Sequence, residues 1–364
     1  MPDEVDRNIA ALPQLLSSLS PDDRRRFERI FQVDVSTSTF RAPAAMHAWM
    51  MEHFGSEESV QSQTVVKVTN LITLEGALYN KLRARRPMDS RVAVDLADRI
   101  AAKLGDTFCR PLECTPEDLF GRVWGKHCVT ASNLAKADGY HGLVIFDEHN
   151  PLTFDSEMVK DYIDTGLAWA RLAHCEDREA CNFLFLWNCL WRSGSSIVHG
   201  HAQVLLGKGI HYAPVEHLRR AALLYRIGHG VSYFDDLCKV HTSLGLVQNY
   251  RRIRVLSYLT PAKEKEVLLI APRLDDDLKL AIFRVLRCLL DRLSVCSFNL
   301  AIYMKPIDSS QQGWQGFPVV VRIVDRGDVN TETSDIGAME LYGAPVISSD
   351  PFEVARALAS SFAD

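Results

Sequence analysis

The chain has 364 residues, 47% of them hydrophobic and 24% charged, so it can bury a core larger than one small module needs. A formal net charge of -5 argues against a general nucleic-acid or membrane-surface binder, because such proteins normally carry a basic excess. Nine cysteines in no regular framework, no apolar run of bilayer-spanning length and no signal-peptide pattern predict a cytoplasmic protein with reduced thiols. A small molecule is therefore the expected partner.

The first 60 residues are predicted to form an added helical segment. Ser20 is a candidate N-cap directly before Pro21, and residues 44–54 form a second helical stretch. From Val65 the sequence VVKVT alternates and is rich in β-branched residues, which predicts the first strand. We therefore place a boundary after residue 60.

Three groups of polar residues follow this boundary. The basic run Arg83-Ala84-Arg85-Arg86-Pro87 is either a solvated turn or an anion-binding segment. Cys109 and Cys114 are separated by four residues, a spacing found in zinc sites and also among core cysteines. His149 closes an apolar strand candidate that begins at His141.

After a predicted helix over 155–174 and a predicted strand over 182–188, residues 193–203 read SGSSIVHGHAQ. In a strand, His199, His201 and Gln203 point to one face, and the small or apolar residues between them point to the other. The loop before them offers backbone N–H groups and hydroxyls to an anion. These hydroxyls belong to Ser193, Ser195 and Ser196.

His201, in the middle of the polar row, is the candidate nucleophile. A neutral imidazole attacks phosphorus without a base, provided that a hydrogen bond holds its second nitrogen. The alternative is a pair of partly buried histidines on an ordinary amphipathic strand. The complete H-x-H-x-Q row behind a Ser/Gly loop favours the functional interpretation.

This row resembles the histidine-triad (HIT) superfamily, and specifically its transferase branch of galactose-1-phosphate uridylyltransferases and dinucleoside-polyphosphate phosphorylases. Hydrolases of the superfamily have a third histidine where Gln203 stands. The resemblance implies that His201 becomes nucleotidylated and that Gln203 binds the phosphate oxygens. A neutral amide is no general acid or base for water, so the covalent intermediate can wait for a phosphate acceptor.

The same resemblance implies roles for other residues. Arg83 and Arg86 match a basic segment of the uridylyltransferases and are implied to bind substrate phosphates. Asn188, eleven positions before His199, matches the family's phosphate-binding asparagine.

Some uridylyltransferases also hold a structural zinc ion with a Cys pair and two histidines. The matching candidates here are Cys109, Cys114, His149 and His199. The spacing of the two cysteines is not the family's, so core thiols remain the alternative. His127 and Cys128 are rival ligands.

Beyond residue 210 the sequence repeats its own order of strand, helix, strand and strand. The repeated elements are expected at 266–271, 275–294, 298–304 and 317–324. Where the first copy has His199 to Gln203, the second has the apolar Phe317-Pro318-Val319-Val320-Val321. We therefore predict an α+β fold of two tandem HIT-like halves, 61–210 and 211–364, each with an antiparallel sheet flanked by helices, of which only the first is catalytic.

The motif and the repeat together predict a nucleotidyltransferase. It transfers a nucleoside monophosphate, through nucleotidyl-His201, between a nucleotide sugar or dinucleoside polyphosphate and a phosphate acceptor, and this step needs no cofactor. A phosphorylase that uses inorganic phosphate is the alternative within the same chemistry, and a non-catalytic nucleotide-binding regulator is the alternative from another class. A homodimer is an open expectation, because residues 334–342 resemble a family segment that completes the site from the other half or across a dimer.

Overall fold

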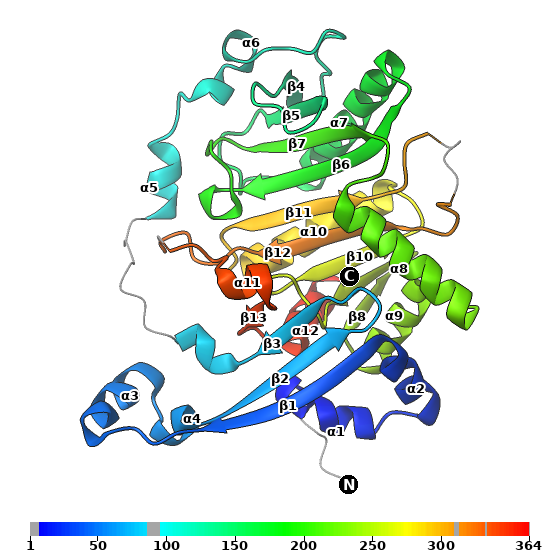
Figure 1. Cartoon of the computed structure of the whole chain (residues 1–364). Coiled ribbons are helices and arrows are strands. Elements are labelled where there is room, and N and C mark those ends of the chain that lie inside the picture. Colours follow the sequence, from blue (N-terminus) through cyan, green and yellow to red (C-terminus); the bar gives the residue numbers. More distant parts are fainter. Residues whose placement is uncertain (1–6, 86–94, 309–312, 332, 364) are drawn as a thin grey trace.

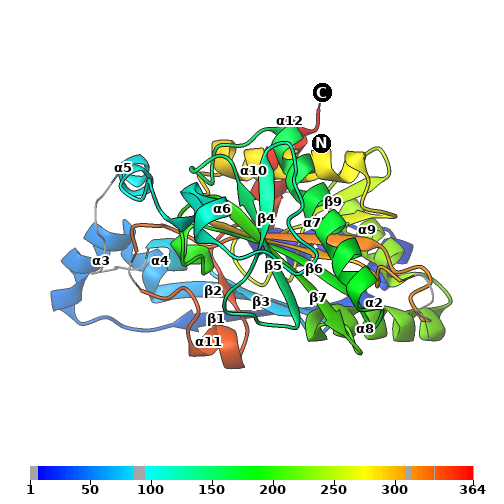
Figure 2. The same ribbon diagram turned by 90° about the horizontal axis from the view of Figure 1, so that it is seen from above.

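The computed structural model describes residues 7–85, 95–308, 313–331 and 333–363. Its centre is a nine-stranded antiparallel sheet, which carries helices on one face and a smaller sheet on the other (Figures 1 and 2). The α+β class predicted from the sequence is confirmed.

The first half of the large sheet has the strand order β4-β5-β7-β6. Its strands are β4 (Cys128–Ser132), β5 (Tyr140–Phe146), β6 (Ala180–Cys189) and β7 (His201–Lys208). The second half continues from β6 with the order β11-β12-β10-β9-β8. Its strands are β8 (Val247–Tyr250), β9 (Ile253–Ser257), β10 (Val267–Ala271), β11 (Phe298–Tyr303) and β12 (Val319–Asp325).

The two halves repeat one another in mirrored strand order. In the first, strand β5, helix α7 (Ser156–Glu176) and strands β6 and β7 give the order β5-β7-β6. In the second, β10, α10 (Asp276–Arg292), β11 and β12 give β10-β12-β11. The halves join edge to edge where β6 pairs with β11. The duplicated order predicted from the sequence is therefore present.

Helices α7 and α10 cover one face of the large sheet (Figure 2). Each begins at an aspartate N-cap, because Asp155 and Asp275 accept hydrogen bonds from the N–H groups of Met158 and Leu278. Their apolar positions recur at helical spacing and pack on alternate residues of the strands to form the main core. This packing leaves the opposite face of β6 and β7 for polar side chains.

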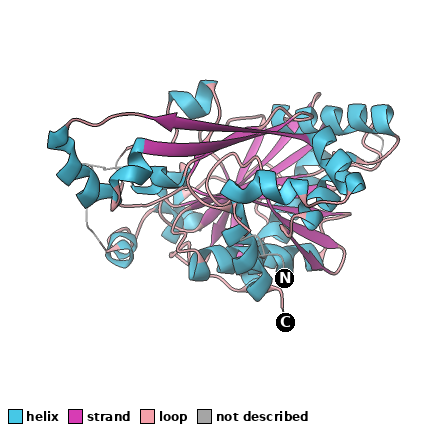
Figure 3. Cartoon of the chain, turned by 90° about the horizontal axis from the view of Figure 1, so that it is seen from below, coloured by secondary structure: helices cyan, strands magenta, loops and turns pink. Residues whose placement is uncertain are grey.

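A four-stranded sheet of order β1-β2-β3-β13 lies on that opposite face, beneath the second half (Figure 2). Its strands are β1 (Phe31–Thr39), β2 (Ser62–Asn70), β3 (Gly76–Tyr79) and β13 (Val346–Ile347). The long β1–β2 pair crosses the molecule with helices at both ends (Figure 3). The first 60 residues are therefore not all helical, since the β-branched run FQVDVSTST forms β1 and pairs with β2.

The remaining helices pack around these sheets. They are α1 (Leu12–Ser17), α2 (Pro21–Ile30), α3 (His47–Phe54), α4 (Glu57–Gln61), α5 (Leu96–Ala101), α6 (Pro111–Cys114), α8 (Ala213–His229), α9 (Tyr233–Ser243), α11 (Ala338–Tyr342) and α12 (Pro351–Ser361). Ser20 caps α2 with Pro21 at its first position, as the sequence predicts. Among the described residues, none of the helices combines the length and apolar character needed to cross a bilayer.

Candidate functional site

Strand β7 presents its polar residues on one face, as its alternation predicts. Ala202, Val204 and Leu206 lie in the core under α7, so His201 and Gln203 face the other side of the sheet. His199 lies just before the strand and is buried.

Gly200, between the two histidines, has a packing reason to be glycine. Its N–H donates to the His149 carbonyl and its carbonyl accepts from the Phe146 N–H. A Cβ at this position would lie 2.6 Å from the Phe146 ring, so no larger residue fits without movement. The close contact holds both flanking histidines against the end of β5.

His201 has a defined tautomer. Its Nδ1 lies 2.8 Å from the carbonyl oxygen of His199, and a carbonyl only accepts, so Nδ1 carries the hydrogen and donates it. Burial lowers the pKa of His201, which keeps the ring neutral near pH 7. Nε2 therefore carries a lone pair, and among the described residues it has no hydrogen-bond partner. This is the electronic state that a nitrogen nucleophile needs.

The side-chain amide of Gln203 is oriented by His141 of β5. Ala137 N–H donates to His141 Nδ1 at 3.0 Å, so Nε2 of the neutral ring carries the hydrogen. Burial lowers the pKa of His141, which favours this neutral form. Nε2 also has Asn133 Nδ2 at 3.1 Å, but with the hydrogen on Nε2 it donates to Gln203 Oε1, which lies 3.1 Å away. The Gln203 oxygen is thereby occupied, and its NH₂ group is left to donate elsewhere.

Asn188 and the serine loop lie at the end of β6. Asn188 lies two residues beyond Leu186, which pairs with Gln203, so both amides are on the same face of the sheet. The Ser193 hydroxyl donates to the Leu190 carbonyl at 2.7 Å, and the Ser195 hydroxyl donates to the Ile197 carbonyl at 2.6 Å. Two of the three expected hydroxyl donors thus stabilise the loop itself. The third, at Ser196, is exposed.

The Nδ1 atoms of His149 and His199 lie close together beside the serine loop. His199 Nε2 donates to the Phe146 carbonyl at 2.7 Å, and His149 Nε2 donates to the Ile100 carbonyl at 3.1 Å. In the neutral rings both Nδ1 atoms therefore carry lone pairs, yet they lie 3.1 Å apart. Two lone pairs at this distance repel unless a cation or a proton lies between them. Burial lowers the pKa of His199, which disfavours the proton.

Two further ligand atoms complete this group. Cys109 Sγ lies 3.3 Å from His149 Nδ1 and 3.4 Å from His199 Nδ1. Asp106 Oδ1 lies 3.7 Å from His199 Nδ1, and Asp106 Oδ2 is buried without a hydrogen-bond partner. The four ligand atoms all lie within 4.8 Å of one another. This group, Asp106, Cys109, His149 and His199, could hold a metal ion, and we call it the metal-binding group.

The structure brings together three of the four sequence candidates for that ion. Cys114, at the end of α6, is not part of the metal-binding group, and Asp106 takes the fourth place. The rival ligands are outside it too. His127 N–H donates to Asp161 at 2.7 Å, and Cys128 Sγ lies 3.5 Å from the same carboxylate.

Phe108 connects the metal-binding group to His201, the candidate nucleophile. It lies between two of the ligands, Asp106 and Cys109, in a 3₁₀ turn whose N–H groups Asp106 caps. Its ring contacts the ring of His201 edge to face, with the centroids 5.0 Å apart. The same turn therefore supplies two ligands and one wall of the site.

No protein-family model matches the chain, and no curated protein sequence does. Several solved structures share its fold. An ADP-glucose phosphorylase from Arabidopsis thaliana, with bound ADP-glucose, has 17% identity and a TM-score of 0.60 over 80% of this chain and 97% of that chain. A GalT-like protein from Arabidopsis thaliana has 17% identity and a TM-score of 0.56 over 70% of this chain and 92% of that chain. A uridylyltransferase has 17% identity and a TM-score of 0.54 over 68% of this chain and 88% of that chain. The chain has the GalT-like fold. The tandem architecture expected from the sequence is confirmed.

Within this GalT-like fold, Arg83 lines a cavity of about 210 Å³ together with Arg192, Lys263 and Arg326. A second cavity, of about 500 Å³, shares Arg192 and Arg326 with it and reaches Gly194 of the serine loop. Five carboxylates, of Glu264, Asp325, Asp328, Asp335 and Glu340, also line the first cavity, so Arg83 lies on a surface of mixed charge that continues to the loop. Arg86, its predicted companion, is outside the described residues.

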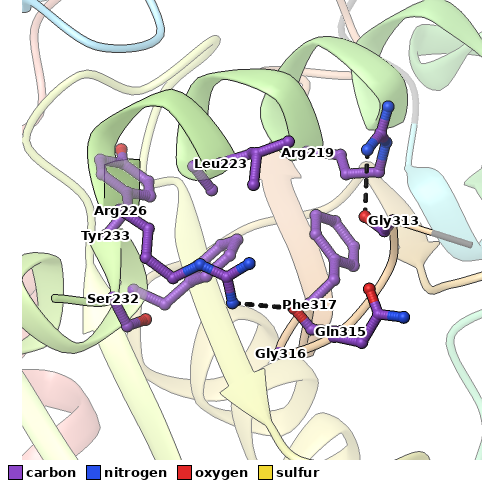
Figure 4. Close-up of a pocket in the computed structure, with 11 residues that line it drawn as sticks. Arg219, Leu223, Arg226, Ser232, Tyr233, Gly313, Gln315, Gly316 and Phe317 are labelled. Carbon is purple, nitrogen blue, oxygen red and sulfur yellow. Dashed lines mark hydrogen bonds between the residues drawn. The ribbon is translucent and has the colours of Figure 1, made fainter. Parts of the chain in front are cut away.

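A separate cavity lies between α8 and residues 313–317 (Figure 4). Arg219 and Arg226 of α8 donate to the carbonyls of Gly313 and Gln315, and so close the cavity on one side. Its volume is about 80 Å³, whereas sites for organic ligands usually have several hundred. We therefore exclude it as the nucleotide site.

Two residues that orient or complete the site were not predicted from the sequence. The sequence indicates His141 only as the start of a strand, because its partner Gln203 lies 62 positions away. Asp106 was not recognised at all. Its position three residues before Cys109 was the available signal, because a short Asp-x-x-Cys turn places both side chains on one side.

Proposed function

We propose that the protein is a nucleotidyltransferase that works in two steps through a nucleotidyl-histidine. His201 Nε2 attacks the α-phosphorus of a nucleotide sugar or dinucleoside polyphosphate and forms a P–N bond. The bond from that phosphorus to the bridging oxygen breaks, and the leaving phosphate takes the electron pair. A phosphate acceptor then attacks the same phosphorus, and the P–N electrons return to Nε2.

The observation that carries this proposal is the hydrogen bond from His201 Nδ1 to the His199 carbonyl. It fixes the lone pair on Nε2 and stabilises the positive charge that develops on the ring as the new bond forms. The GalT-like fold supports the proposal, since an ADP-glucose phosphorylase and a uridylyltransferase share it.

Gln203 and Asn188 are the proposed donors to the phosphate oxygens. Gln203 has its oxygen occupied by His141, so its amide presents N–H to the site. Such oriented donors stabilise negative charge that grows on phosphoryl oxygens. Neither amide can take a proton from water, so the intermediate persists until a phosphate acceptor arrives.

The acceptor is either a sugar phosphate or inorganic phosphate. The phosphorylase alternative is favoured by one observation, the similarity to an ADP-glucose phosphorylase over 97% of that chain. ADP-glucose is therefore the first donor to test. A regulator without turnover remains the alternative from another class, and it predicts binding without a covalent product.

We propose zinc for the metal-binding group. One thiolate, two imidazoles and one carboxylate are ligands that zinc accepts, and four of them match its usual coordination number. The ion's role would be structural. It would screen the facing Nδ1 lone pairs of His149 and His199 and hold the Phe108 turn against His201.

The test is to trap the intermediate. The protein is incubated with ADP-glucose, UDP-glucose or diadenosine tetraphosphate without an acceptor, and its mass is measured before peptide mapping. We expect the mass of one nucleoside monophosphate on His201, released by inorganic phosphate or a hexose 1-phosphate. His201→Ala should abolish the adduct, and His229→Ala, a substitution at an exposed histidine on α8, should leave it unchanged. Binding without an adduct in the wild type would refute the transfer mechanism.

A further inference from the structure

Two asparagines lie side by side where the halves of the large sheet join. Asn188 of β6, in the half with His201, is directly opposite Asn299 of β11, in the half without catalytic residues. The side chains also touch, because Asn299 Nδ2 lies 2.6 Å from Asn188 Oδ1. A residue of the degenerate half therefore contacts a proposed phosphate ligand.

The amide of Asn299 has only one permitted orientation. Arg326, just beyond β12, donates from Nη1 to Asn299 Oδ1. On the other side, Asn299 Nδ2 lies 2.9 Å from the Ser193 carbonyl. A guanidinium only donates and a backbone carbonyl only accepts, so the two contacts independently assign the oxygen and the nitrogen of this amide.

This orientation decides that of Asn188. Since Asn299 donates from its NH₂ group, the side-chain oxygen of Asn188 must accept that hydrogen bond. The NH₂ group of Asn188 is turned away from Asn299, and within the described residues nothing accepts a hydrogen bond from it. A free donor on the face of the sheet that carries Gln203 is suited to a phosphate oxygen.

Arg326 is itself held firmly. Its Nε and Nη2 both donate to the carboxylate of Asp335, each at 2.8 Å, and only 13% of its side-chain surface is exposed. Lys263 lies 3.7 Å from the same carboxylate. The chain of contacts from Asp335 through Arg326 and Asn299 to Asn188 therefore has one defined direction of donors and acceptors.

We propose that Asn299 and Arg326 are positioning residues, which make Asn188 a hydrogen-bond donor towards the substrate phosphate. The inference rests on the proposed function, in which Asn188 binds that phosphate. It also gives the degenerate half a role in the reaction. That half has no nucleophile, but it sets the polarity of a ligand in the other half.

An isosteric substitution separates polarity from packing. Asn299→Asp keeps the shape and the acceptor for Arg326, but it presents an oxygen to Asn188 and to the Ser193 carbonyl. The Asn188 amide must then turn its NH₂ group to Asp and its oxygen to the phosphate. Asn299→Ala removes the contact and leaves Asn188 free to take either orientation. A packing role predicts that alanine is the worse replacement, whereas a polarity role predicts that aspartate is.

The rate of adduct formation is measured in a single turnover with the donor that labels the wild type. We expect Asn299→Asp to be about 100-fold slower and Asn299→Ala about 10-fold slower, since one misdirected donor to a developing anion costs on this scale. In an Asn188→Ala background, Asn299→Asp should add less than about threefold, because its target is gone. Asn249→Asp, which adds the same charge at an exposed position on β8, should match the wild type.

Should Asn299→Asp not fold, Arg326→Met and Arg326→Lys replace it. Methionine removes the donor and should slow labelling, whereas lysine keeps a donor and should restore most of the rate. Equal rates for the aspartate and alanine variants, or an undiminished aspartate effect without Asn188, would overturn this inference. A wild type that forms no adduct would instead overturn the proposed function.

Discussion

At the scale of single residues, backbone carbonyls decide the chemistry of the site. Each of His201, His199 and His149 donates one ring N–H to a carbonyl oxygen, which leaves the other nitrogen with a lone pair. For His201 that nitrogen is the proposed nucleophile. For the other two it is a ligand atom in the metal-binding group. One type of contact thus supports two different proposed roles.

Gln203→Glu tests the polarity of the second amide. The carboxylate still accepts from His141, but it presents an oxygen in place of N–H to the substrate phosphate. We expect adduct formation to slow by about 100-fold, because a donor is replaced by a negative charge. Single-turnover labelling gives this rate. Gln248→Glu, on the distant strand β8, is the matched control, and a Gln203→Glu rate within threefold of the wild type would contradict the assigned role.

The H-x-H-x-Q row could be placed from the sequence because strand alternation is a local rule. Alternation puts His201 and Gln203 on one face whatever the neighbours are. The partners that orient them were not predictable. His141 meets Gln203 only because of the β5–β7 register, and Asn299 meets Asn188 only because the halves join at β6 and β11. Register depends on the whole sheet.

At the scale of elements, the short turn that contains Asp106 and Cys109 has two tasks. It supplies ligands on either side of Phe108, whose ring lies against His201. An ion bound there would hold the turn through two bonds, and with it the Phe108 ring that contacts His201. The turn is otherwise fixed by its Asp106 cap and by the packing of Phe108 with Leu143 and Ile145.

Measuring the metal content of variants tests whether Asp106, as in the structure, or Cys114, as expected from the sequence, is the fourth ligand. We expect about one zinc ion per chain in the wild type and in Cys114→Ala, because four ligands remain in both. Asp106→Ala and Cys109→Ala should lose most of it. Elemental analysis after dialysis measures the content, and thermal unfolding checks that each variant is folded. Retention in Asp106→Ala with loss in Cys114→Ala would reverse the assignment.

Most elements were predictable because their signals are local. Helix α10 lies within the expected 275–294, and α7 begins at Ser156, one residue into the expected 155–174. Strand β1 was not predicted, since its neighbours α2 and α3 suggest a helical segment and seven of its nine residues are exposed. Its pairing with β2 across 22 intervening residues stabilises it. Long-range pairing of this kind leaves little trace in a local pattern.

At the scale of the whole molecule, one buried charge cluster ties the small sheet to the second half. Arg322 of β12 donates to Glu266, next to β10, at 2.6 Å, and to Glu75, between β2 and β3, at 2.5 Å. Glu75 also accepts from the Tyr258 hydroxyl at 2.7 Å. Arg322 thus occupies, in the degenerate half, the strand that corresponds to β7. The strand that carries the proposed nucleophile in one half therefore carries part of a buried charge cluster in the other.

Arg322→Ala tests how much this buried charge cluster contributes to stability. Glu266 is fully buried, so its carboxylate would lose its cation and keep its desolvation cost. We expect the free energy of unfolding to fall by about 3–5 kcal/mol at pH 7, the usual cost of breaking a buried pair. Urea unfolding followed by tryptophan fluorescence measures the change.

The pH dependence identifies the cause of that loss. Burial already raises the pKa of Glu266, and without Arg322 the pKa rises further, so the folded variant binds a proton that the unfolded chain releases. The variant should therefore recover stability relative to the wild type as the pH falls from 7 to 5. Glu266→Gln combined with Arg322→Met should be less destabilised than Arg322→Ala and lack this recovery. A deficit in Arg322→Ala that does not change with pH would point to lost packing instead of an unpaired charge.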